Sequence, residues 1–230
     1  MTALVSVVIV SYRDAALLPA AIDSVLAQDD PAVELVVVDN ERSGAVAEVV
    51  DRYRGRPLRM VPGRLPTTGA GRNTGAAAAR GSLLAFLDAD DLWPAAGLAA
   101  TRAALATDPA LDGVFGRVRR FVDAEASPIA DPERAAGIAE APRAGRMITA
   151  ALLDRAGFDR VGPFDEAARL GDQLDWVARA ADAGLRLGQI DDVVLLRRSH
   201  SANTTRERRD EYGEYARVLK QIIDRRRGRA

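Results

Sequence analysis

The chain has 230 residues, enough for a large α/β domain with a sizeable buried core. Hydrophobic residues make up 48% and charged residues 28%, which excludes a disordered chain. The 32 basic and 33 acidic side chains give a formal net charge of -1, which argues against a nucleic-acid-binding surface. Since cysteine is absent, disulfides, thiolate metal sites and a cysteine nucleophile are excluded.

The N-terminal stretch MTALVSVVIVSYRD is apolar but lacks the basic region and the small-residue cleavage site of a signal peptide. Its β-branched residues favour a first buried strand instead. No apolar run approaches the ~20 residues of a membrane span. We therefore predict no membrane span and, by default, a cytoplasmic protein.

Strands and helices alternate through the first half of the chain. The continuous β-branched run 5–10 predicts a strand buried on both faces. Further strands are predicted at 33–39, 57–61 and 83–87, and helices at 16–28, 45–54, 71–80 and 95–105. This alternation predicts an α/β fold: a Rossmann-like, mostly parallel sheet with helices on both faces. Ligands of such sheets bind outside the carboxyl ends of the strands.

The pattern changes after Asp112. We predict strands at 113–121, 184–190 and 193–198, helices at 147–157 and 172–184, and a mobile loop at 123–146. The tail from Glu207 is a charged helix whose apolar stripe could pack on the domain or on a second copy, as in a homodimer. We expect one domain over 1–230, with a larger half at 1–112, a smaller half at 113–206 and the helix at 207–230.

Three carboxylates, Asp88, Asp90 and Asp91, follow the predicted strand 83–87. Two like charges ~4 Å apart repel by roughly 4 kcal/mol at an effective dielectric near ~20, so we expect a partner for this cluster. The candidates are a metal ion, a sugar hydroxyl, a helix N-terminus or water. Ser11 and Asp39 end two other predicted strands, and this agreement with Asp88 indicates a site at that edge of the sheet.

The glycines Gly69, Gly71 and Gly75, followed by a helix and Asp88, come near the dinucleotide-binding pattern. Two features weaken this interpretation. The stretch VPGRLPTT separates the glycines from the preceding strand. Arg72 also stands where the chain would have to pass close to a pyrophosphate, so we do not favour NAD(P).

Together the motifs resemble glycosyltransferase family 2, which has the GT-A fold. The stretches that carry the resemblance, in that family's order, are VSVVIVSYRD, AIDSVLAQ, ELVVVDN, GAGRNTGAAAARG, LAFLDADDLWP, VGPFDEAARLGDQLDWVARAADAG and RRSHSANTT. They cover the chain to about Thr205. The resemblance implies sugar transfer from a nucleotide-sugar donor, most often a UDP-sugar, to an acceptor that could be a small molecule, a glycan or a peptide. It also implies that 1–112 is the nucleotide-sugar-binding half, that 113–206 is the acceptor-side half, and that the loop 123–146 governs acceptor choice.

The resemblance also implies a metal site that holds Mn or Mg. Asp90 would bind the metal, and Asp88 would contact the ribose or the metal. His200, the single histidine of the chain, would complete the site, since imidazole is a suitable ligand for Mn. Asp91 could instead cap the following helix. Arg197 or Arg198 could help to hold the diphosphate.

The nucleotide pocket follows from the same resemblance. Asp39 would accept a hydrogen bond from the nucleobase, and Arg72 would face the nucleotide near a helix N-terminus. The residues expected to line the pocket beside them are Val10, Ser11, Tyr12, Asp88 and Ala89. A turn aspartate at Asp39 and a surface arginine at Arg72 are the ordinary alternatives.

The chain departs from the family where the catalytic base is expected. The family begins its acceptor-side helix with Gly-Glu-Asp-x-Asp, but this chain has GDQLDW, so Asp172 replaces Glu and Gln173 replaces the base. A neutral amide cannot accept the proton of an acceptor hydroxyl.

Three interpretations of this departure remain. Asp172 could be the base, although it could equally be the N-cap of the helix. Asp175, one turn deeper, could be the base. Or the site has lost ordinary inverting transfer, either as a protein that only binds nucleotide sugars or because its acceptor is acidic enough to need little help. A nucleotidyltransferase is a weaker alternative, since no Gly-rich loop follows the first strand.

Overall fold

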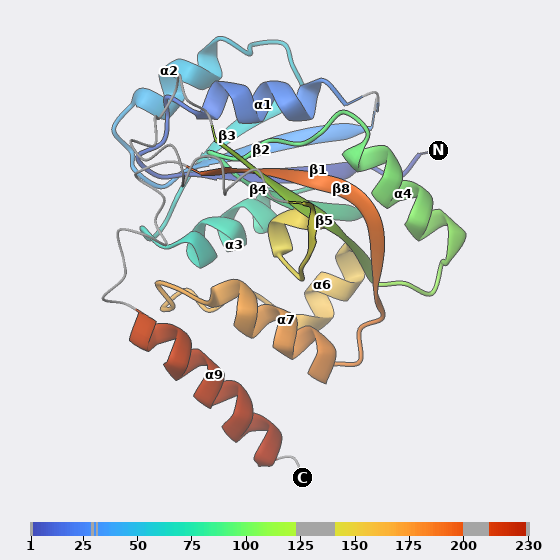
Figure 1. Ribbon diagram of the computed structural model, residues 1–230. Coiled ribbons are helices and arrows are strands. Elements are labelled where there is room, and N and C mark those ends of the chain that lie inside the picture. The colour runs from blue at the N-terminus through green and yellow to red at the C-terminus, as the bar shows by residue number, and fades with distance from the viewer. Residues whose placement is uncertain (1, 29, 31, 123–140, 200–211, 229–230) are drawn as a thin grey trace.

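The computed structural model describes residues 2–28, 30, 32–122, 141–199 and 212–228. Over these ranges the chain forms an eight-stranded sheet with helices on both faces (Figure 1). The strands are β1 (Val5–Ser11), β2 (Val33–Asp39), β3 (Leu58–Pro62), β4 (Leu83–Asp88), β5 (Gly113–Val122), β6 (Arg143–Ala144), β7 (Ala151–Asp154) and β8 (Leu187–Ser199). The helices are α1 (Leu18–Leu26), α2 (Ala45–Asp51), α3 (Thr68–Ala78), α4 (Gly97–Thr107), α6 (Arg155–Val161), α7 (Asp172–Asp182), α9 (Tyr212–Arg227) and the 3-10 turn η1 (Ile148–Ala150).

The strand order is β3-β2-β1-β4-β7-β5-β6, and β8 pairs with β5. β1 lies between β2 and β4 and is parallel to both. The chain order reverses at this point, so the carboxyl ends of β1 and β4 border the crevice in which α/β sheets bind ligands. The predicted α/β fold with a mostly parallel sheet is confirmed. The antiparallel pairs all involve β7 or β6.

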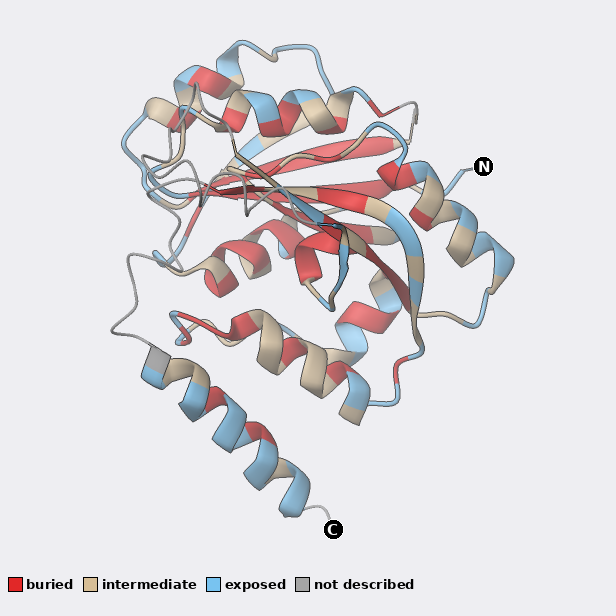
Figure 2. Cartoon of the chain, viewed as in Figure 1, coloured by how far each residue is buried: buried red, intermediate tan, exposed pale blue. Residues whose placement is uncertain are grey.

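The sheet is buried on both faces, as the red strands in Figure 2 show. Successive residues of β1 alternate between two apolar clusters: Ile9 packs with α1, and Val10 packs on the opposite face. The second cluster holds the rings of Phe158, Phe164 and Trp176, which bring α6 and α7 against the sheet. This double burial explains the unbroken apolar runs Val7–Val10 of β1 and Leu35–Val38 of β2.

Two glycines let α3 lie directly on β1. A Cβ atom at Gly75 would lie 2.2 Å from Val8 Cγ1, and one at Gly71 would lie 2.5 Å from Val10 Cγ1. The glycine pattern that resembles a dinucleotide motif thus serves helix–sheet contact. The close approach carries Arg72, one residue after Gly71, beneath the edge at which β1 and β4 end.

Two predicted elements were wrong. Residues 151–154 are not helical but form β7 between β4 and β5, because Leu152 and Leu153 are buried in the apolar clusters on opposite faces of the sheet. The two short strands predicted at 184–190 and 193–198 form one strand, β8, which follows β5 with register shifts around Arg117. Part of the predicted loop 123–146 lies outside the described residues.

A buried carboxylate ties the amino end of the sheet together. Glu34 of β2 accepts hydrogen bonds from Ser6 Oγ (2.6 Å), the Arg80 amide (2.6 Å) and Arg59 Nη1 (2.7 Å). Burial by itself raises the pKa of Glu34, but these hydrogen bonds outweigh it and lower the pKa to about 2. The network joins β1, β2 and β3 at the edge opposite the ends of β1 and β4.

The Glu34 network predicts a specific acid sensitivity. Because the pKa of Glu34 is about 2 in the folded chain against an ordinary 4.5, its contribution to stability is present above pH 4.5 and is lost as the pH falls toward 2. Glu34→Gln should destabilise the fold by about 3 kcal/mol at pH 7 and remove this component of the acid transition, as measured by chemical unfolding across pH.

Asp51→Asn is the matched control for this experiment. Asp51 forms an ion pair with Arg54 in which the two side chains are 63% and 80% exposed. Its replacement should change the free energy of unfolding by less than about 0.5 kcal/mol. Equal losses in the two variants would show that the Glu34 network does not stabilise the sheet.

Candidate functional site

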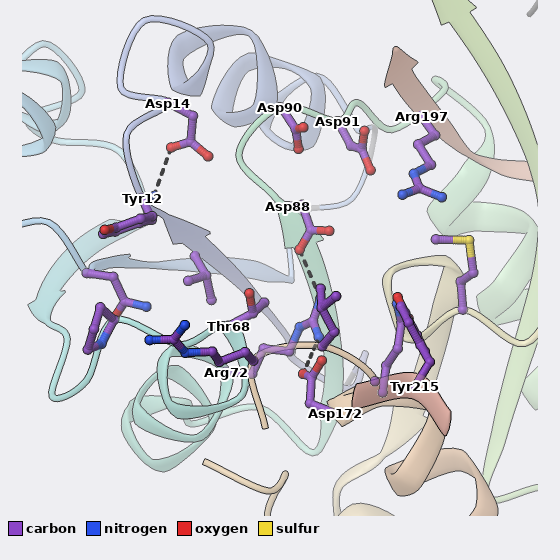
Figure 3. Close-up of a pocket in the computed structure, with 18 residues that line it drawn as sticks. Tyr12, Asp14, Thr68, Arg72, Asp88, Asp90, Asp91, Asp172, Arg197 and Tyr215 are labelled. Atoms are coloured by element: carbon purple, nitrogen blue, oxygen red, sulfur yellow. Dashed lines mark hydrogen bonds and ion pairs between the residues drawn. The ribbon is translucent and has the colours of Figure 1, made fainter. Parts of the chain in front are cut away.

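A pocket opens at the carboxyl edge of the sheet, around the ends of β1 and β4 (Figure 3). Among the described residues, its lining includes five carboxylates, Asp14, Asp88, Asp90, Asp91 and Asp172, and three arginines, Arg72, Arg169 and Arg197. Val10 and Tyr12 form the wall that follows β1, and Tyr215 of α9 lies on the far side of Asp88 from Tyr12 (Figure 3). Residues from both halves of the chain therefore meet in a single pocket.

Most of the predicted site residues lie at this pocket or directly beside it. The predicted residues that line it are Val10, Tyr12, Arg72, Asp88, Asp90, Asp172 and Gln173. Ser11, Asp39, Ala89 and Asp175 are not part of the lining, although the first three adjoin residues that are. His200 lies outside the described residues. The lining residues that we did not predict include Asp14, Asn40, Thr68, Arg169 and Tyr215.

Asp88, Asp90 and Asp91 form a compact acidic cluster, with one carboxylate oxygen of each within 4.8 Å of the others. Burial raises the pKa of Asp91 well above its ordinary value, and the charges of Asp90 and Asp88 raise it further. Burial likewise raises the pKa of Asp88, although Arg72 opposes the shift. A set of closely spaced carboxylate oxygens suits a hard divalent cation such as Mg²⁺ or Mn²⁺, so these residues fit the metal that the sequence predicts.

Asp91 is not a helix cap, contrary to that expectation. It accepts a hydrogen bond from the Arg198 amide (2.8 Å), and α4 begins only at Gly97. Arg198 is buried, and its Nε donates to the Asp90 carbonyl oxygen (2.8 Å). These contacts fasten the loop of the acidic cluster to β8. Of the two arginines expected near a diphosphate, Arg197 lines the pocket and Arg198 lies buried behind it.

Arg72 bridges the two halves of the site (Figure 3). It is 2% exposed, and its guanidinium contacts Asp88 Oδ1 at 3.0 Å and Asp172 Oδ2 at 2.7 Å. The ring of Phe164 lies 5.6 Å from the guanidinium carbon. Although burial by itself lowers the pKa of Arg72, the charges of Asp172 and Asp88 outweigh it and raise the pKa. Arg72 is thus a buried cation that joins β4 to α7, not a surface arginine.

Asp14 adds a further carboxylate to the pocket. It accepts hydrogen bonds from Ser11 Oγ (2.5 Å) and the Tyr12 amide (3.0 Å), which fold the loop after β1 back on itself. Burial raises the pKa of Asp14 to about 6, and the charges of Asp90 and Asp88 add to the shift against these hydrogen bonds. The sequence signal for this residue is a carboxylate three positions after a strand end.

Asp39 is buried at the end of β2, where its Oδ1 accepts hydrogen bonds from the amides of Glu41 (3.1 Å) and Arg42 (2.8 Å). These bonds shape the turn through which Asn40 reaches the pocket lining. Asn40 Nδ2 donates to the Thr67 carbonyl oxygen (3.1 Å), just before α3. Asp39 therefore has the turn role that was its ordinary alternative, with its second carboxylate oxygen remaining for a ligand role.

The two candidate bases, Asp172 and Asp175, and Gln173 at the usual base position occupy different places at the start of α7. Asp172 is the first residue of α7 after the N-cap Gly171, so it is not itself the N-cap, and it is paired with Arg72. Gln173 lines the pocket, and its Oε1 accepts a hydrogen bond from the Ile148 amide (3.3 Å). Asp175 forms ion pairs with Arg179 (2.7 Å) and with Arg225 of α9 (3.0 Å), outside the pocket lining.

The C-terminal helix α9 completes the pocket. Glu214 accepts a hydrogen bond from the Leu170 amide (3.0 Å). The ring of Tyr215 lies beside the start of α7, since a Cβ atom at Gly171 would lie 3.5 Å from Tyr215 Cδ1. Of the predicted apolar stripe, Ile222 is buried together with Val218, whereas Leu219 and Ile223 are each 48% exposed. Among the described residues, no helix combines the length and the apolar character that crossing a membrane requires.

Known proteins with similar sequences or structures are glycosyltransferases. The sequence model of glycosyl transferase family 2 matches residues 6–155. An uncharacterized glycosyltransferase of Nostoc sp. (strain PCC 7120) is 39% identical over 92 residues, which are 39% of this chain and 29% of that protein. The chain thus matches less than a third of the length of this curated relative.

Two solved structures show the same fold. Staphylococcus aureus TarS 1-349 in complex with UDP-GlcNAc matches 87% of this chain and 60% of its own length, with a TM-score of 0.69 and 18% identity. The mannosyltransferase PcManGT of Pyrobaculum calidifontis, in complex with GDP-Man and Mn²⁺, matches 97% of this chain and 65% of its own length, with a TM-score of 0.71 and 22% identity. The predicted GT-A fold is confirmed.

The Arg72 bridge predicts a large loss of stability when its charge is removed. Arg72→Met leaves two partly buried carboxylates without their shared cation, so it should lower the free energy of unfolding by about 3–5 kcal/mol at pH 7. Arg72→Lys keeps the charge but lacks the two-pronged guanidinium. Its free energy of unfolding should therefore lie between those of the unmodified chain and of Arg72→Met. Urea unfolding of each variant measures these losses.

Arg54→Met is the surface control, since the Arg54 side chain is 80% exposed. Adding Asp172→Asn to Arg72→Met should recover part of the loss, because it removes one of the two orphaned charges. Stability of Arg72→Met equal to that of Arg54→Met would show that the bridge does not hold the two halves together.

Proposed function

The chain belongs to glycosyl transferase family 2, and from this premise we propose that it transfers a sugar from a UDP-sugar to an acceptor, with a divalent cation and with inversion. The observation that carries the proposal is the cluster of Asp88, Asp90 and Asp91 in a pocket at the sheet's switch point. A nucleotide sugar has an anionic diphosphate leaving group, and the three carboxylates of the cluster are also negatively charged. A site for the donor therefore needs a cation between the carboxylates and the diphosphate.

Asp90 and Asp88 would hold the cation, which we propose to be Mn²⁺ or Mg²⁺, and Asp91 keeps their loop on β8. When bound, the cation supplies Lewis-acid stabilisation of the departing diphosphate. Arg72 keeps Asp88 ionised and oriented through its 3.0 Å contact. Its second contact, to Asp172, fixes the start of α7 beside the sugar.

Tyr12 and Asp39 would hold the nucleobase at the end of β1 and β2. One oxygen of Asp39 is used by the turn, so the other would accept the uracil N–H. The complex of TarS with UDP-GlcNAc supports a UDP-sugar in a fold of this kind, whereas the complex of PcManGT with GDP-Man makes the guanine nucleotide the competing donor. Single displacement at the anomeric carbon gives inversion.

One observation favours a second candidate, a protein that binds nucleotide sugars without transferring them. Gln173 stands where family members carry a base, and its amide cannot take up a proton. On this alternative, the donor half of the pocket would bind UDP-sugars normally while no sugar would be released.

Calorimetric titration with UDP and GDP, each with and without Mn²⁺, tests the donor side. We expect UDP to bind in the presence of Mn²⁺ and more tightly than GDP. Asp90→Asn should weaken Mn²⁺-dependent UDP binding by more than about tenfold. Loss of a group that only supports a metal ligand already costs about tenfold in metal affinity, and Asp90 would be a ligand itself. Asp51→Asn, far from the pocket lining, is the control.

An absence of UDP binding with Mn²⁺ would contradict the proposal. Release of UDP from UDP-sugars then separates the two candidates. An enzyme should show Mn²⁺-dependent release that Asp90→Asn abolishes, whereas a binding protein should show binding and no release.

A further inference from the structure

We propose that the acceptor is an anionic oxygen nucleophile, a phosphate monoester, and that Arg197 and Tyr215 bind it. This inference rests on the proposed function, because it names the acceptor of the same site. It follows from three observations. Gln173 accepts a hydrogen bond, the described carboxylates near it already have partners, and polar groups lie on the acceptor side of Asp88.

Gln173 is fixed in place as a neutral group. Its Oε1 accepts a hydrogen bond from the Ile148 amide (3.3 Å), so its Nε2, a donor, is the part of the side chain that remains for a ligand. A donor at the wall of the pocket favours an oxygen that carries negative charge. It offers nothing to the proton of a neutral hydroxyl.

The neighbouring carboxylates are already engaged. Asp172 is paired with Arg72 at 2.7 Å, and taking up a proton would leave that buried cation with one partner fewer. Asp175 is paired with Arg179 and Arg225. Asp14 lies beside Tyr12, across the pocket from Tyr215 (Figure 3). Of these three aspartates, Asp172 alone lies on the acceptor side of the pocket, and its ion pair with Arg72 disfavours it as a base.

Polar donors gather on that side instead. Arg197 and Tyr215 both line the pocket on the side of Asp88 away from Tyr12 (Figure 3). A guanidinium, a phenol hydroxyl and an amide Nε2 are together suited to a phosphate.

A phosphate monoester removes the need for a base. Its second pKa is about 6, so at neutral pH its oxygens carry no proton that transfer must remove. An oxygen of the phosphate attacks the anomeric carbon, and the bond between that carbon and the donor diphosphate breaks. The electron pair leaves with the nucleoside diphosphate. The products are UDP and a phosphodiester in which the phosphate joins the acceptor to the sugar, and no proton is transferred.

UDP release tests the acceptor class. The full chain with Mn²⁺ and a UDP-sugar that it binds is offered phenyl phosphate, inorganic phosphate or micellar decyl phosphate, with benzyl alcohol and decanol as matched hydroxyl acceptors. We expect at least one phosphate to accelerate UDP release by more than about tenfold over water, and the alcohols to have no such effect. Preference for decyl phosphate would identify a lipid headgroup, and preference for the other two a soluble phosphate.

Two variants locate the acceptor. Arg197→Met should raise the KM for the phosphate about 10–100-fold, the loss of one charged hydrogen bond, and leave UDP affinity unchanged. Gln173→Asp should slow the phosphate reaction and allow the alcohols to react, because it adds a base and repels the anion. Arg197→Lys keeps the charge, so it should raise the KM less than Arg197→Met does. Unfolding curves show that each variant is folded.

Several outcomes would overturn the inference. These are faster release with alcohols than with phosphates, no acceleration by any phosphate from a chain that binds UDP, or loss of UDP affinity in Arg197→Met, which would place Arg197 at the donor diphosphate. Failure to bind UDP would instead overturn the proposed function, so the two failures are distinguishable.

Discussion

The site depends on one buried cation. Arg72 lies between Asp88 at the end of β4 and Asp172 at the start of α7, with contacts of 3.0 and 2.7 Å. Without it, both carboxylates would lose the cation that contacts them directly. The bridge also requires α3 to lie close to β1, which the glycines at 71 and 75 permit. Backbone packing, charge and the joining of the two halves are therefore linked.

Two further carboxylates of the pocket, Asp91 and Asp14, are held by neutral hydrogen-bond donors. Asp91 is held by the Arg198 amide, and Asp14 by Ser11 and Tyr12, but these neutral donors do not cancel the charge. Burial, with the charges of the neighbouring aspartates added, raises the pKa of Asp91 well above its ordinary value and that of Asp14 to about 6. A bound divalent cation would relieve this repulsion and lower the affinity of the cluster for protons, so metal and protons compete for the same oxygens.

The sequence alone predicts those elements whose spacing of apolar residues fits only a strand or only a helix. β1 and β2 are buried on both faces, and Asp88 ends a strand in which four successive residues are buried. The strand β7 was missed because the stretch AALLDRAG fits a helix equally well, and its place between β4 and β5 depends on distant partners. Tyr215 carried no local signal, since contacts between α9 and α7 bring it to the pocket.

Packing alone does not explain the glutamine at 173. A carboxylate at the same place could accept the same hydrogen bond from the Ile148 amide, and charged acceptors make the stronger bonds. The pocket already has five carboxylates among its described lining residues, and Arg72 pairs with only two of them. A further negative charge beside Asp172 would oppose any anionic ligand on that side, whereas an amide presents a donor to it. The amide is therefore best explained by the charge of what binds there.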